Sequence, residues 1–169
     1  MTNQNQDAYG ELSQRALEQI RRGDPSVDAV AHLYMEPPGH DPFGYTVFGT
    51  GDLLVRRMVW KRAEDSRRAQ TSSPGEFSTE PTITSDLNSV DRPAFEELWE
   101  AGQQIAVPLM AMRPIYAMLD GTVFGIRRDG FYNGFHVHWV AGEAGWEQLT
   151  TWVKQMRQLL ASGFAASGD

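Results

Sequence analysis

The stretch from Leu119 to Leu160 constrains the fold more than any other part of this 169-residue chain. Asp-Gly pairs at residues 120–121 and 129–130 are typical of tight turns between neighbouring strands. The segments around these turns are rich in β-branched and aromatic residues, and we expect strands at Ile115–Leu119, Val123–Arg127 and Phe135–Val140. The stretch therefore predicts a three-strand antiparallel meander.

One amphipathic helix follows this meander. Apolar residues recur in it at intervals of three and four positions, at Trp146, Leu149, Val153, Met156 and Leu160. That spacing gathers them on one helical face, which must pack against the rest of the protein. Gly163 predicts the end of the helix.

Hydrophobic patterns and turn residues also define elements in the first two thirds of the chain. We expect helices at Ala8–Arg22, capped by Asp7, and at about Pro93–Ile105, capped by Ser89 or Asp91. Strands are expected at Ala29–Met35, at Tyr45–Phe48 and Leu53–Trp60 as a hairpin, and at Thr82–Thr84 as a short edge strand. The prediction is an α+β fold. Its antiparallel sheet, a hairpin plus the C-terminal meander, is covered by N-terminal, central and C-terminal helices.

The same reading predicts where regular structure is absent. Residues 63–81 combine serine, threonine, charge, proline and glycine, so a long loop is expected there. Residues 1–6 and 164–169 are expected to fray. A length of 169 residues suits one domain with a substantial core, and the prediction is a single domain over residues 1–169.

Composition narrows the functional classes. The chain has no cysteine, which excludes disulfides, thiolate metal ligands and thiol catalysis. Its net charge of −7 opposes binding to nucleic acid and to anionic membranes, and favours a basic protein partner. The first ten residues carry neither a basic start nor an apolar run, so a secretory signal is not expected. A cytoplasmic protein that binds no nucleic acid and no membrane is the prediction.

The strongest catalytic candidate is the pair His136 and His138. Alternation along the strand puts both on one face, and His-x-His spacing supplies two ligands in many zinc sites. A third ligand would have to come from elsewhere, the candidates being His32, His40, Asp41 and Glu143. The competing interpretation is a polar strand face, and we favour it: no cofactor and no catalytic residue is predicted.

Two further motifs are better explained by structure than by chemistry. Gly49-Thr50-Gly51 precedes a strand, so no helix N-terminus follows it to bind a phosphate, and a hairpin turn is predicted. Arginines gather around Trp60 and Lys61, as in single-strand nucleic-acid grooves, but carboxylates interrupt them. We therefore read this region as a solvated strand and loop.

The chain resembles small bacterial immunity proteins that neutralise polymorphic or contact-delivered toxins. The resemblance covers about half of the chain and is carried by the following segments: Leu119-Asp120-Gly121-Thr122, Val123–Arg128, His138-Trp139, Trp146-Glu147-Gln148-Leu149, Glu80-Pro81-Thr82 and Phe95-Glu96-Glu97-Leu98-Trp99. It implies a non-catalytic protein that binds a cognate toxin or effector in the cytoplasm. An alternative partner is a secreted effector that the protein would chaperone.

If the toxin is basic, exposed carboxylates would mimic the phosphates that it normally binds. The candidate contacts lie in two predicted loops, and they are Glu36, Asp41, Glu64, Asp65, Glu76 and Glu80. The sequence gives no oligomeric state.

Overall fold

A computed structural model describes residues 3–24, 27, 29–73, 75–107, 121–128 and 134–165. The predicted strand Ile115–Leu119 lies outside these residues. The elements, in chain order, are α1 (Asn3–Arg22), β1 (Ala29–Glu36), β2 (Phe43–Phe48), β3 (Leu53–Trp60), α2 (Arg62–Thr71), β4 (Ile83–Val90), α3 (Arg92–Gln103), β5 (Val123–Arg128), β6 (Phe135–Val140) and α4 (Glu147–Ala165).

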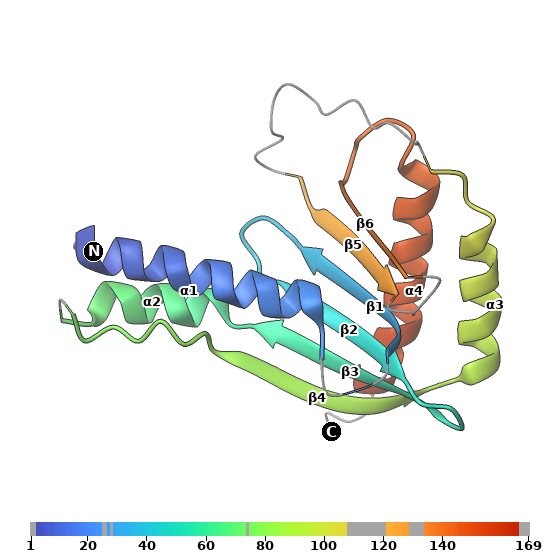
Figure 1. The fold of residues 1–169 in the computed structure, drawn as a ribbon, viewed down its shortest axis with the longest axis horizontal. Coiled ribbons are helices and arrows are strands. Elements are labelled where there is room, and N and C mark those ends of the chain that lie inside the picture. The colour runs from blue at the N-terminus through green and yellow to red at the C-terminus, as the bar shows by residue number, and fades with distance from the viewer. Residues whose placement is uncertain are drawn as a thin grey trace.

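The described strands form one open antiparallel sheet in the order β4-β3-β2-β1-β5-β6 (Figure 1). The predicted hairpin joins β2 and β3, and β5 pairs with β6. β1 lies between β2 and β5, so the N-terminal strands and the C-terminal hairpin share one sheet. The predicted α+β class is confirmed.

Helices pack on both faces of the sheet (Figure 1). On one face, α1 buries Leu12, Ala16 and Ile20, one residue per turn, in a core that also includes a residue of α2. On the other face, α4 buries Val153 and Met156, and α3 lies beside α4. We call these the α1-side core and the α4-side core.

Strand β1 shows how the sheet serves both cores. Leu33 points into the α4-side core, whereas its neighbour Tyr34 points into the α1-side core. The opposing glycine makes room for this phenol, since a Cβ at Gly125 would lie 1.9 Å from Tyr34 Cζ. Each face of the strand therefore packs against a different set of helices.

The predicted loop at residues 63–81 is wrong over its first half, because α2 occupies Arg62–Thr71. The segment lacks an apolar stripe, so hydrophobic periodicity does not predict a helix there. Glu64 and Asp65 in the first turn and Arg68 in the last suit the helix dipole. Only Ala69 and Asp65 are buried, and they fix the helix on the sheet.

Several element boundaries also differ from expectation. α1 begins at Asn3 and not at Ala8, so residues 3–6 are helical and Asp7 is not a cap. The amide of Asn5 is buried and donates to Ala69 O (3.1 Å) and Ser72 O (3.0 Å), which ties the start of α1 to the end of α2.

Strand β4 runs to Val90 and is the predicted edge strand, though much longer. α4 continues through Gly163 to Ala165, where Gly163 O accepts from the Asn88 amide of β4. The cap of α3 is as predicted: Asp91 Oδ2 accepts from Ala94 N at 3.0 Å.

Candidate functional site

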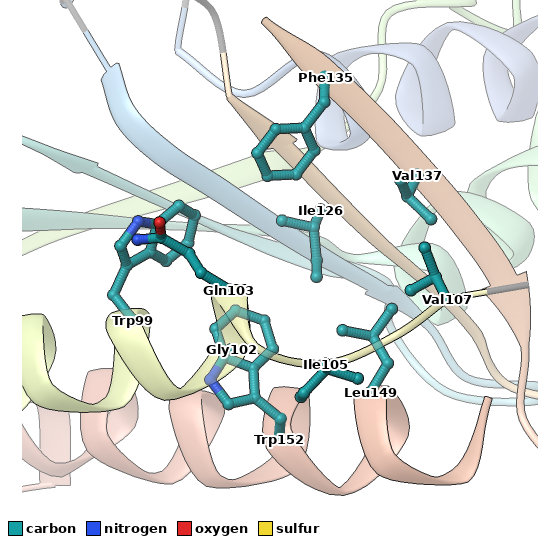
Figure 2. Close-up of a pocket in the computed structure, with 10 residues that line it drawn as sticks. All are labelled: Trp99, Gly102, Gln103, Ile105, Val107, Ile126, Phe135, Val137, Leu149 and Trp152. Atoms are coloured by element: carbon teal, nitrogen blue, oxygen red, sulfur yellow. The ribbon is translucent and has the colours of Figure 1, made fainter. Parts of the chain in front are cut away.

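An apolar hollow of about 300 Å³ lies between the end of α3, the first half of α4 and strands β5 and β6 (Figure 2). We call it the α3–α4 hollow. It is lined by Trp99, Gly102, Gln103, Ile105, Val107, Ile126, Phe135, Val137, Leu149 and Trp152. Its volume is at the lower end of the range in which proteins bind small molecules or the side chains of partners.

The helical wall of the hollow depends on a close approach of α3 to Trp152. A Cβ at Gly102 would lie 2.4 Å from Trp152 Cε2, so only glycine lets the indole lie against the helix. Trp152 Nε1 donates to Leu98 O at 2.6 Å. The ring of Trp99 lies 5.8 Å from that of Trp152, measured between centroids. The two indoles thus form a rigid wall whose polar N–H is satisfied on α3.

The sheet wall of the hollow comes from the face of β6 that sequence alternation predicted. Val137 is the register partner of Ile126 and packs against the α4-side core. Phe135 lies further along the same face, and its ring is directed into the hollow (Figure 2). Its side chain is nevertheless 43% exposed.

Exposed apolar surface is concentrated at this hollow. Three large hydrophobic residues in the described part of the chain are exposed: Leu87, Val107 and Phe135. Two of the three, Val107 and Phe135, line the hollow. Clustered exposure of apolar side chains around a concavity marks an interaction site more strongly than a single exposed residue does.

The lining of the α3–α4 hollow favours the transfer of apolar groups out of water. None of the ten lining side chains is ionisable, and Gln103 carries their only amide. Such a surface removes apolar groups from water but supplies no acid, base or nucleophile. The geometry therefore suits binding of an apolar group, with Gln103 as a hydrogen-bonding partner at the rim.

Two of the six predicted partner contacts are engaged inside the protein. Asp65 is fully buried and accepts from Trp60 Nε1 (2.8 Å), from Thr82 N (2.9 Å) and from Thr82 Oγ1 (2.6 Å). Glu36 is 9% exposed and receives two hydrogen bonds from Arg21, which raise the pKa of that guanidinium. Neither carboxylate is presented on the surface as the prediction required.

The other four carboxylates come from two separate segments of the chain. Glu64, Glu76 and Glu80 are exposed on α2 and the segment that follows it. Asp41 lies in the connection between β1 and β2 and lines a different cavity, together with Lys154 of α4. None of these residues lines the α3–α4 hollow, so the acidic candidates and the apolar site are separate.

The two candidate metal ligands lie together on the α1-facing side of β6. The rings of His136 and His138 are 5.7 Å apart between centroids, and Tyr34 Oη lies 3.2 Å from His136 Nε2. Burial raises the pKa of Tyr34 to about 12, so this phenol is neutral at physiological pH.

The proposed third ligands lie elsewhere. Both ring nitrogens of buried His32 are engaged, one 2.8 Å from Ile20 O and the other 3.0 Å from Thr46 Oγ1. Glu143 accepts from Val140 N in the turn after β6, and His40 lies with Asp41. Across the residues that the structure describes, no group of three candidate ligands is close enough to hold a metal ion.

The fold and the site together define an open-sheet α+β protein with a markedly apolar hollow. Among the described helices, none has the length and apolar character needed to cross a membrane. Comparison with protein-family models, curated proteins and solved structures found no match to the chain.

Sequence reasoning did not find the α3–α4 hollow. Trp99, Trp152 and Phe135 each fall on an apolar face of a helix or strand, and this pattern predicts burial in the core. The missed signal was Gly102 within an otherwise bulky apolar stripe, which indicates a close contact with another element. The sequence does not say which element makes that contact.

Proposed function

We propose that this protein is a non-catalytic binding protein, specifically an immunity protein that neutralises a cognate bacterial toxin in the cytoplasm. The observation that carries the proposal is the α3–α4 hollow, with Phe135 and Val107 exposed at its edge. Its apolar lining suits the insertion of an aromatic or aliphatic side chain from the toxin. Anchor residues of this kind supply most of the binding energy in protein interfaces.

This proposal places the interface on the α4 side of the sheet. It replaces the acidic interface expected from sequence, because two of the six carboxylates are buried and none of the six lines the hollow. The segments that resemble immunity proteins include β5, β6 and the start of α4, and these elements build the hollow. Affinity would come from apolar burial at the centre, with charge acting mainly on the association rate.

The test is a comparison of Phe135→Ser with Leu87→Ser. Both remove an exposed large hydrophobic residue, but only Phe135 lines the hollow. Cognate toxin candidates are the variable C-terminal domains of large secreted proteins encoded immediately upstream. We expect wild type and Leu87→Ser to restore growth on co-expression and to bind the toxin equally. Phe135→Ser should bind at least about tenfold more weakly.

Equal binding by Phe135→Ser and wild type would show that the toxin does not bind at the hollow. Failure of every upstream toxin domain to bind would count against the immunity function itself. Circular dichroism of both variants shows whether the fold is retained.

A secretion chaperone is the second candidate, since such proteins need an exposed apolar groove and the hollow supplies one. A chaperone would bind an unfolded effector segment, commonly as a dimer. Light scattering coupled to size exclusion, with and without synthetic effector peptides, separates the two functions. A monomer that binds folded toxin but not the peptides supports immunity, and a dimer that binds the peptides supports the chaperone.

A further inference from the structure

A second hollow, of about 380 Å³, lies on the opposite flank of α4 at the β1–β2 end of the sheet. It is lined by Met35, Pro37, His40, Asp41, Phe43, Thr122, Phe124, Lys154 and Arg157. Lys154 and Arg157 are three residues apart on α4, so both side chains reach the same flank of the helix. We call this cavity the cationic hollow.

The cationic hollow differs from the α3–α4 hollow in its chemistry. Its apolar lining includes Phe43 of β2 and Phe124 of β5, and Met35 of β1 is the register partner of both. Lys154 and Arg157 bring positive charge to the same cavity, and Asp41 is its only carboxylate. An apolar lining with two adjacent cations suits a molecule that has a hydrophobic body and one acidic group.

Arg157 is held in place before any ligand arrives. Its guanidinium lies 5.1 Å from the centre of the Phe43 ring, a cation–π arrangement. Its positive charge, together with that of Arg57, also opposes the rise that burial causes in the pKa of the Tyr45 phenol. A guanidinium fixed in this way loses little conformational freedom when it binds a carboxylate.

Lys154 is available to a ligand. Its side chain is exposed, and in the described part of the chain it forms no ion pair. The net charge of −7 does not prevent anion binding here, because salt screens charges beyond about 8 Å at physiological ionic strength. The local cations, and not the overall charge, therefore decide what the hollow attracts.

We propose that the cationic hollow binds a small organic carboxylate with an aromatic or aliphatic body. The apolar body lies against Phe43 and Phe124, and the carboxylate is bound by Lys154 and Arg157. The site is separate from the α3–α4 hollow and does not depend on the toxin-binding proposal.

Titration of the full chain with 4-phenylbutyrate, followed by isothermal calorimetry and amide NMR shifts, tests this assignment. Two probes separate the contributions: 4-phenylbutanol keeps the body without the charge, and acetate keeps the charge without the body. We expect saturable one-site binding of 4-phenylbutyrate, with shifts in β1, β2 and α4. Each of the other probes should bind at least about tenfold more weakly.

Three variants sharpen the test. Lys154→Gln should weaken binding of 4-phenylbutyrate about tenfold, because a charge-assisted hydrogen bond is lost. Lys61→Gln is the matched control, since Lys61 is the only other lysine and does not line the cavity. Asp41→Asn should strengthen binding severalfold by removing the carboxylate that repels the ligand.

Equal affinity for 4-phenylbutyrate and acetate would show an adventitious anion contact and overturn the proposal. So would equal affinity for 4-phenylbutanol, or binding that Lys154→Gln leaves unchanged. Shifts confined to α3 and β6 would assign the ligand to the other hollow and equally contradict the inference.

Discussion

Asp65 shows how a single charged residue can be structural although its sequence context suggests a solvated loop. It is fully buried, and four groups approach its carboxylate: the Trp60 indole N–H, the Thr82 backbone N–H and hydroxyl, and Arg68. These contacts join the end of β3, helix α2 and the residue before β4. A buried acceptor with this many donors is costly to remove, because each donor is left unpaired.

We predict that Asp65→Ala lowers the free energy of unfolding by about 2–4 kcal/mol. Glu64→Ala, one residue earlier and exposed, should change it by less than about 0.5 kcal/mol. Urea denaturation followed by circular dichroism measures both. Similar losses in the two variants would mean that helix α2 depends on general charge rather than on this buried network.

Tyr34 predicts how stability depends on alkaline pH. Burial raises its pKa from 10.0 to about 12, with a smaller contribution from the charge of Glu36. Because the folded state has the higher pKa, the stabilisation is fully present below pH 10 and is lost as the pH rises toward 12. We expect the urea midpoint to fall over this interval.

Tyr34→Phe should make that fall shallower, since it removes the titrating phenol. A smaller slope will remain, because burial also raises the pKa of Tyr45. Urea titrations at a series of alkaline pH values supply the comparison. An unchanged slope in Tyr34→Phe would assign the alkaline transition to other groups.

At the level of elements, the packing of α3 on α4 depends on Gly102. A methyl group there would lie 2.4 Å from Trp152 Cε2 and 2.6 Å from Nε1, so the helices would have to separate. Overpacking of this kind costs about 1–3 kcal/mol, which exceeds the gain of about 1 kcal/mol from replacing a helical glycine.

We therefore predict that Gly102→Ala is destabilising. Gly10→Ala is its control, because a Cβ at Gly10 of α1 meets nothing within 4 Å. That variant should stabilise the protein by about 0.5–1 kcal/mol. Chemical denaturation measures the change in the free energy of unfolding for each variant. Stabilisation by both substitutions would show that α3 moves freely relative to α4.

The elements differ in how well sequence predicts them, and the reason is the source of their stability. α4 is predictable because its apolar residues follow the helical period, and the alternation in β6 correctly separates Phe135, Val137 and Trp139 from the two histidines. α2 is not predictable in this way, because its buried residues are one alanine and one aspartate. Its attachment comes from contacts distant in sequence, such as Asn5 with Ala69.

The candidate site could not be predicted for a related reason. The α3–α4 hollow combines residues from α3, β5, β6 and α4, and its shape depends on how one helix lies against another. Apart from Gln103, the lining residues are of types that are also common in protein cores. What distinguishes Phe135 is that the core does not fully cover it, and coverage is a property of the assembled structure.

At the level of the whole molecule, the two cores are coupled through their shared strands. Adjacent residues of β1 enter opposite cores, so neither core can lose its strand without disrupting the other. We predict that Leu12→Ala in the α1-side core and Met156→Ala in the α4-side core each cost about 2–5 kcal/mol.

Both variants should unfold in one transition. Circular dichroism and tryptophan fluorescence provide the test, since Trp60 belongs to the α1-side core and Trp139, Trp146 and Trp152 belong to the other. Coincident midpoints in each variant are expected. Separated midpoints would mean that the two layers of helices unfold independently.

The position of β1 in the sheet has a consequence for synthesis on the ribosome. β1 emerges early, but its partner β5 and the helix α4 that covers one of its faces emerge only after α3. At about 5–20 residues per second, the nascent chain carries an open strand edge and an uncovered apolar face for on the order of ten seconds. Yield in a foreign host should therefore rise when trigger factor, which covers exposed apolar segments of nascent chains, is abundant.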